Sequence, residues 1–285
     1  MSSTGGGMHK SEQQSRLRFI EFILYWEGKI QNKQLVAQFG VSRQQAWQDL
    51  QRYAERVPAN LQALQQNKPY QAAANLQPTL FTPDIDHYLR WVQHPACFEQ
   101  PGEAKSSNSA TLQLPPRQVS AGLIRVLVQA LREQQRVEVD YVSLTNPDRE
   151  GRIISPHTLI NTGLRWHLRG WCEKHREYRD FVLSRFRGEA ELLGPAEKTG
   201  ADDSAWHTEI TLQLVPDRRL SPEQQAVLVH DYQMHNGQLQ LTTRAALAQY
   251  LLQQMQVNVK TLDAIPEAQQ LELANLHDIK PWLFS

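Results

Sequence analysis

The stretch NKQLVAQFGVSRQQAWQDLQRYAERVP, residues 32 to 58, decides the fold of the N-terminal part of the chain. Two short segments in it carry apolar residues at helical spacing. Gly40 can adopt the left-handed conformation that ends the first helix, and Ser42 is a good N-cap for the second. The apolar positions are Leu35, Val36 and Phe39 in the first segment and Ala46, Leu50 and Tyr53 in the second. With a supporting helix over residues 12 to 27, this pattern predicts a helix-turn-helix.

The exposed side of the second helix carries amides and guanidinium groups, the side chains that read adenine and guanine edges in the major groove. Nine Lys and Arg against five Asp and Glu between residues 10 and 68 favour phosphate contacts. A two-stranded wing is expected over residues 60 to 80. The predicted DNA contacts are Ser42, Arg43, Gln44, Gln45, Gln48 and Arg52 in the helix and Lys68 and Tyr70 in the wing. A helical hairpin with a merely solvated polar face is the alternative.

The bulk composition is that of an ordinary globular chain of two or three domains. Its 285 residues are 40% apolar and 21% charged, with a formal net charge of zero, so nucleic-acid binding must rest on local patches. The two cysteines, Cys97 and Cys172, form no metal-ligand pattern, and we expect no metal and no cofactor. FIEFILYW (19 to 26) is too short for a membrane span, so a cytoplasmic protein is expected.

The period changes from helical to alternating after a polar linker at residues 99 to 116. A helix at 117 to 135 is followed by expected strands at 136–144, 151–161, 164–173 and 178–187. From 205 the pattern alternates between strands and helices and includes an expected strand VNVKTL (257 to 262). These patterns predict an α+β multidomain protein with segments at 10–98, 117–200 and 201–285.

The strand RWHLRGW (165 to 171) places two arginines and a histidine on one face. Such groups are not buried without partners, so that face is either solvated or a binding surface. Seven basic and three acidic residues lie between 165 and 187, which favours an anion pocket. The alternative is a polar face of Arg–carboxylate pairs, for which four residues are available: Asp140, Glu173, Glu177 and Asp180.

Four motifs together resemble the WYL domain of bacterial transcriptional regulators: Tyr141-Val-Ser143, SPHTLI, RWHLRGW and DFVLSRF. Together with the N-terminal helix-turn-helix they resemble the regulators of phage-defence islands, of the BREX and CBASS kind. The name-giving triplet falls on Trp166-His167-Leu168, with histidine in place of tyrosine. The resemblance implies an Sm-like or SH3-like β-barrel, a small α+β C-terminal extension, a dimer, and a barrel that senses a nucleotide or nucleic-acid ligand. By motif position it implies ligand contacts at Tyr141, Ser143, His157, Arg165, His167, Arg169, Ser184 and Arg185.

These observations predict a homodimeric transcriptional repressor of a defence operon that binds an inverted-repeat operator in double-stranded DNA. A phosphate-bearing effector would modulate its DNA affinity by binding two states unequally. Two alternatives remain open. The serines and histidines of the strands permit a nucleic-acid-processing enzyme, although no spacing matches a known hydrolytic motif. The apolar tail PWLF permits an interaction module acting through the C-terminal domain.

Overall fold

The computed structural model describes residues 5–62, 69–98, 115, 117–145, 147–261 and 263–284, with no side chains described at 5–10 and 97. The chain divides into two compact units, Met1–Ile153 with Leu183–Gly194 and Ile154–Val182 with Pro195–Ser285. The segment limits expected from the sequence, and the linker at 99–116, which lies almost wholly outside the described residues, stay predictions.

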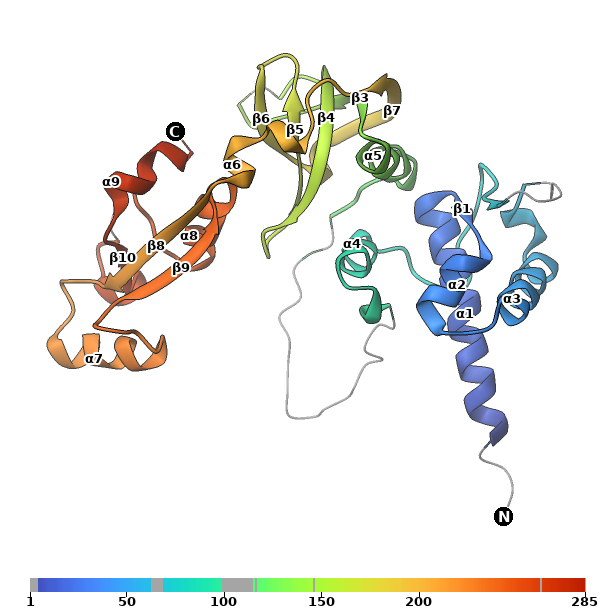
Figure 1. The fold of residues 1–285 in the computed structure, drawn as a ribbon, viewed down its shortest axis with the longest axis horizontal. Coiled ribbons are helices and arrows are strands. Elements are labelled where there is room, and N and C mark those ends of the chain that lie inside the picture. Colours follow the sequence, from blue (N-terminus) through green and yellow to red (C-terminus); the bar gives the residue numbers. More distant parts are fainter. Residues whose placement is uncertain are drawn as a thin grey trace. The chain divides into compact units, whose positions relative to one another are not determined.

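The first unit begins with the helix-turn-helix that the sequence predicts (Figure 1). Its helices are α1 (Gly5–Glu27), α2 (Asn32–Phe39), α3 (Arg43–Arg56), α4 (Ile85–Gln93) and α5 (Ala121–Glu133). Strand β1 (Lys29–Ile30) pairs antiparallel with β2 (Tyr70–Gln71), and Leu61 bridges Ala72. These strands form the base of the expected wing, whose tip at 63–68 lies outside the described residues.

Helix α1 is the centre of this core, and most of its apolar side chains are fully buried: Leu17, Phe19, Ile20, Phe22, Ile23, Leu24 and Trp26. Glu21 lies among them with no exposed surface. Its carboxylate accepts hydrogen bonds from the backbone N–H groups of Thr79 at 2.8 Å and Leu80 at 2.6 Å. Because a buried carboxylate needs such partners, Glu21 fastens the chain that follows the wing onto α1.

A five-stranded sheet has the order β6-β5-β4-β3-β7. Its strands are β3 (Gln135–Tyr141), β4 (Glu150–Asn161), β5 (Trp166–Cys172), β6 (Glu177–Val182) and β7 (Phe186–Pro195). The single strand expected at 178–187 is wrong. A 3-10 turn at Leu183–Arg185 interrupts it, since β6 and β7 lie at opposite edges of the sheet and the chain must leave one edge to reach the other. Among the described residues no β6–β7 pairing closes the sheet, so the expected closed barrel is not found.

The end of the second unit contains a three-stranded sheet of order β10-β8-β9 with helices packed on it. Its elements are α6 (Ser204–His207), β8 (Glu209–Pro216), α7 (Pro222–Asp231), β9 (Leu239–Arg244), α8 (Ala248–Gln254), β10 (Leu271–Leu273) and α9 (Leu276–Ile279). The strand expected at 257–262 is wrong: the Asn258 side chain accepts hydrogen bonds from Lys260 N and Thr261 N, which makes a turn. The third strand is Leu271–Leu273 instead.

The C-terminal tail docks on this unit. Ile279 is buried and Leu283 packs against the same apolar cluster, while the Phe284 ring contacts Tyr250 with centroids 5.2 Å apart. Within the described part of the chain, no helix is long and apolar enough to cross a membrane.

Candidate nucleic-acid interface and polar network

Local signals position α3. Gly40 adopts a left-handed φ of 66° and its N–H caps α2 by donating to Val36 O, while the Ser42 side chain accepts from Gln45 N at 3.1 Å. The predicted apolar face is buried, with Ala46, Leu50 and Tyr53 at zero exposure. The turn residues therefore fix which side of α3 faces outward.

Five of the predicted DNA contacts in this helix are exposed: Ser42, Arg43, Gln44, Gln48 and Arg52. Gln45 differs, since it is half-buried and its Nε2 donates to Asp49 Oδ2 at 3.2 Å. Asp49 is fully buried and also accepts from Arg16 Nε at 2.6 Å and Arg52 Nη1 at 3.4 Å. Gln45 is therefore engaged with Asp49 of the same helix, and its role as a DNA contact stays a prediction.

The base of the wing is tied to the same helix. Gln51 Nε2 donates to the Tyr70 hydroxyl, so β2 and α3 are held together. Beside this contact lies a groove of about 490 Å³ whose basic side chains are Lys33 and Arg43, with Asn32 and Tyr70 also in its wall. Lys68, the other predicted wing contact, lies outside the described residues.

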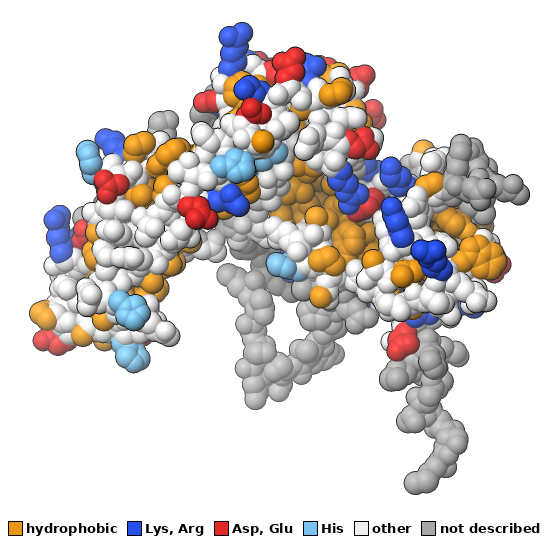
Figure 2. All heavy atoms as spheres, viewed as in Figure 1, with side chains coloured by type: hydrophobic (Ala, Val, Ile, Leu, Met, Phe, Trp, Pro, Cys, Tyr) orange, Lys and Arg blue, Asp and Glu red, His pale blue; other side chains and the backbone are white. Residues whose placement is uncertain are grey.

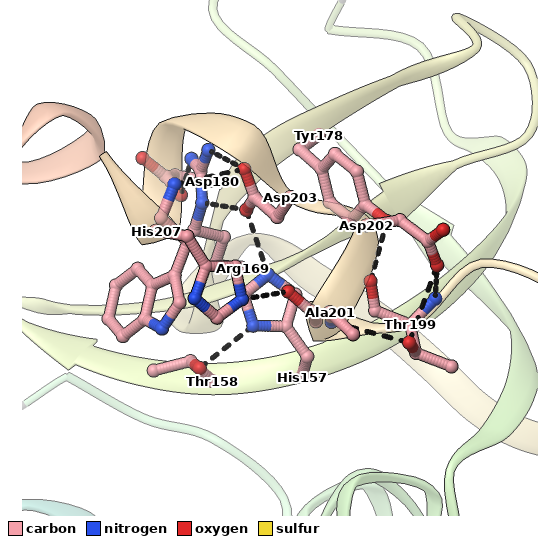
Figure 3. A network of polar contacts seen from close by, with 12 residues as sticks. His157, Thr158, Arg169, Tyr178, Asp180, Thr199, Ala201, Asp202, Asp203 and His207 are labelled. Atoms are coloured by element: carbon pink, nitrogen blue, oxygen red, sulfur yellow. Dashed lines mark hydrogen bonds and ion pairs between the residues drawn. The ribbon is translucent and has the colours of Figure 1, made fainter.

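In the second unit, Arg169 on β5 lies at the centre of a buried polar network, with its partners pointing toward it in Figure 3. Its Nε donates to Asp203 Oδ2 at 2.6 Å and its Nη2 to Asp203 Oδ1 at 3.1 Å. Its Nη1 donates to Asp180 Oδ1 at 2.9 Å. Asp180 also accepts from the Tyr250 hydroxyl at 2.9 Å. The guanidinium expected to be an open anion ligand is therefore neutralised by two carboxylates.

His157 joins this network from β4. Its Nε2 lies 3.0 Å from Asp203 Oδ2 and its Nδ1 lies 2.8 Å from Thr158 Oγ1. Burial lowers the pKa of His157 below its usual value and outweighs the attraction of Asp203. Burial also opposes ionisation of Asp203, but the hydrogen bonds and charge of Arg169 prevail and hold the pKa of that carboxyl below its usual value. The network thus favours a neutral imidazole beside an ionised carboxylate.

The polar face of β5 is covered because residues 199–207 fold over it. Asp203 caps α6, Tyr178 donates its hydroxyl proton to Thr199 O at 2.6 Å, and a Cβ on Gly200 would come within 3.1 Å of the His157 ring. His167 is also buried, with its ring 5.1 Å from that of Tyr250. His167 and Arg169 on this face of the strand are thus buried and Trp171 is half-buried, so the face is not simply solvated, and its role as a binding surface stays a prediction.

The eight predicted ligand residues are distributed over both units. Tyr141, Ser143, Ser184 and Arg185 belong to the first unit and His157, Arg165, His167 and Arg169 to the second. Tyr141 is buried against Phe186, whereas Ser143, Arg165, Ser184 and Arg185 are half-buried. Three of the four carboxylates named as possible arginine partners do pair with one: Asp140 with Arg149, Glu177 with Arg179 and Asp180 with Arg169. The role of the eight predicted residues as ligand contacts stays a prediction.

The sequence did not indicate three residues: Asp203, the buried Asp49, and Trp47, an exposed aromatic residue on α3.

On the face drawn in Figure 2, basic and acidic side chains are interspersed, in keeping with the net charge of zero. Among the described residues, no group of His, Cys, Asp and Glu could hold a metal ion.

Three family profiles match the chain. Residues 12–94 match the winged helix-turn-helix domain of the BrxR transcriptional regulator, residues 122–190 match the WYL domain, and residues 209–279 match the C-terminal dimerization domain of BrxR.

Curated relatives match almost the whole chain. The DNA-binding transcriptional repressor CapW of Escherichia coli is 34% identical over 94% of this chain and 90% of its own length. CapW of Pseudomonas aeruginosa is 33% identical over 94% of this chain and 91% of its own. Among solved structures, the proteasome accessory factor PafBC of Arthrobacter aurescens aligns over 95% of this chain and 48% of its own at 15% identity, with a TM-score of 0.24 that is too low to support a structural argument. On these matches the chain belongs to the BrxR and CapW family of winged-helix, WYL-domain transcriptional regulators.

Proposed function

We propose that this protein is a homodimeric repressor of a phage-defence operon that reads an inverted-repeat operator through α3. The observation that carries the proposal is the outward face of this helix, where Arg43, Gln44 and Gln48 are exposed beside the capping Ser42. Guanidinium and amide groups make paired hydrogen bonds to guanine and adenine in the major groove. Two-fold symmetry then predicts half-sites separated by one helical turn, about 34–36 Å, or a multiple of it.

The experiment is a gel-shift titration of DNA from upstream of the protein's own operon. Replacing Arg43 and Gln44 together by alanine should weaken binding by roughly 30-fold or more, since each lost bidentate contact is worth about 1–3 kcal/mol and the double variant loses two. Arg56→Ala is the matched control, because Arg56 is an exposed basic residue in the last turn of the same helix. Equal affinities of the double variant and the control would show that α3 is not the reading helix.

The second part of the proposal is that a phosphate-bearing nucleotide or nucleic-acid effector modulates DNA binding through the WYL segment. Support comes from the WYL match at 122–190 and from the basic excess between 165 and 187. Because Arg169 is already paired with two carboxylates, half-buried Arg185 is the better candidate for a first contact.

Isothermal titration calorimetry with 5′-phosphorylated tetranucleotides, both DNA and RNA, tests whether Arg185 contacts the effector. Arg185→Ala should lose the heat signal, and Arg179→Ala, which removes an exposed arginine paired with Glu177, should keep it.

Contacts within the first unit support a route from the WYL segment to the DNA-binding helices. Arg125 of α5 donates from Nε to Tyr25 O at 2.8 Å and from Nη2 to Leu24 O at 3.3 Å, so it caps the end of α1. Arg132, two turns later, donates to both carboxylate oxygens of Glu27 at 2.7 and 2.9 Å. A displacement of α5 by the effector would therefore pull on α1, to which α3 is fastened through Asp49.

A further inference from the structure

Trp47 is the side chain of α3 that neither the fold nor the proposed readout accounts for. Its neighbours Ala46 and Leu50 are fully buried, whereas Trp47 is 52% exposed. A fully buried tryptophan removes roughly 150–250 Å² from water, so leaving one half-exposed forgoes a large stabilisation. Single exposed apolar residues are common, however, so the position of Trp47 has to carry the argument.

At 100° per residue, Trp47 projects 40° from Arg43 and 60° from Gln44, and Gln51 lies 40° beyond it. Arg43 and Gln44 are exposed, whereas Gln51 is half-buried. Gln51 is bonded to Tyr70 of the wing, which fixes that side of the face. The buried positions Ala46, Asp49, Leu50 and Tyr53 occupy an arc whose near edge, at Leu50, lies 60° from Trp47. The indole therefore lies at the edge of the face that the proposed function assigns to base reading, beside Arg43 and Gln44.

The chemistry of the major groove supplies an apolar partner for such a side chain. Glutamine amides pair with adenine, and the thymine opposite each adenine carries a 5-methyl group, the distinctive apolar feature of that groove. The two exposed glutamines near the indole, Gln44 and Gln48, match a surface that presents adenine edges beside thymine methyl groups. A contact with another protein chain is less suited to this position, because Arg43 and the amides around it would lose their water without matching partners.

We propose that Trp47 contacts thymine 5-methyl groups in the major groove and makes the operator specific for A·T pairs at those positions. This inference rests on the proposed function, since it requires α3 to be the reading helix. It adds a specificity-determining residue whose contribution is apolar and independent of the hydrogen bonds made by its neighbours.

The test compares two forms of the DNA fragment that the wild-type protein protects in footprinting. One form contains thymine, and the other contains deoxyuridine at every thymine position, which keeps the hydrogen-bonding atoms and removes the methyl groups. Affinities are measured at a salt concentration low enough for all variants to bind. Wild type and Arg56→Ala should each bind the deoxyuridine DNA about tenfold more weakly than the thymine DNA. Trp47→Ala should bind the two forms within about twofold of each other.

The inference is overturned if Trp47→Ala retains the full preference of the wild type for thymine, because the methyl groups are then read by another residue. It is also overturned if the wild type binds both forms equally. Trp47→Phe, which keeps an aromatic ring, should retain most of the preference. Failure of the proposed function has a different signature: the Arg43 and Gln44 double variant would then bind the thymine DNA as tightly as Arg56→Ala.

Discussion

Asp203→Asn tests the polar network most directly, because this exchange removes one negative charge and almost no volume. Asp203 is 1% exposed and accepts four hydrogen bonds, two of them from Arg169 and the others from His157 and the backbone N–H of Trp206. Asparagine keeps one acceptor oxygen but presents an amide group to the second guanidinium nitrogen. The bidentate ion pair is therefore lost while the shape of the site is preserved.

The expected loss of unfolding free energy depends on the hydrogen bonds that Arg169 keeps. Removing one partner of a buried ion pair costs about 3–5 kcal/mol, because the other charge stays buried without compensation. Here Asp180 still accepts from Arg169 at 2.9 Å, so part of the charge remains neutralised. We expect Asp203→Asn to lower the free energy of unfolding by roughly 2–3 kcal/mol.

The assay is urea unfolding followed by tryptophan fluorescence at one fixed protein concentration, since the stability of a dimer depends on concentration. Asp202→Asn is the matched control: the neighbouring carboxylate is 40% exposed and bonds Thr199 and Lys198. Asp202→Asn should lose clearly less stability than Asp203→Asn. Equal losses in the two variants would refute the ion-pair geometry described for Arg169.

Three further predictions concern other contacts. Burial lowers the pKa of His157, so the unfolded chain binds the proton more tightly than the folded chain. The free energy of unfolding should therefore fall as the pH drops below the usual value of 6.5, until the pKa of the folded state is passed. His157→Gln should flatten this pH dependence, measured by urea titrations at stepped pH. Glu21→Leu should destabilise the winged-helix part by about 2–4 kcal/mol, because the N–H groups of Thr79 and Leu80 lose their acceptor. A variant that resists limited proteolysis between residues 70 and 84 as well as the wild type does would contradict this. Arg132→Met should leave operator affinity in gel shifts within about threefold of wild type while weakening its response to the effector, and an unchanged response would exclude α5 as the route.

The helix-turn-helix could be predicted because its determinants are local. The left-handed Gly40 and the capping Ser42 lie within three residues of each other, and the apolar spacing fixes the buried face of α3. Helical spacing does not predict that Gln45 is half-buried, because its side chain bonds Asp49, which also bonds Arg16, 33 residues earlier in the chain. Side-chain direction at the edge of a helix face is thus set by tertiary contacts.

The environment of Arg169 could not be predicted for a related reason. Asp203 is 34 residues away in sequence and outside every strand motif, so its approach to β5 depends on how residues 199–207 fold back. The strand break at Leu183–Arg185 likewise follows from the sheet order and not from local propensity. Alternation identified the strands, but it could not identify what covers them.

The occupied state of Arg169 constrains how an anionic effector could act on the second unit. An anion that paired with Arg169 in place of Asp203 would leave the Asp203 carboxylate, which is 1% exposed, with only His157 and the N–H of Trp206 as partners. Such a buried, poorly paired charge would destabilise the fold unless residues 199–207 moved outward. These residues lead directly into β8, where the match to the dimerization domain begins. Asp203→Asn separates the two possible modes: it removes the competing charge and should tighten binding of a phosphorylated tetranucleotide if the effector displaces Asp203. If Arg185 is the contact and the network stays intact, the same substitution should leave that affinity unchanged.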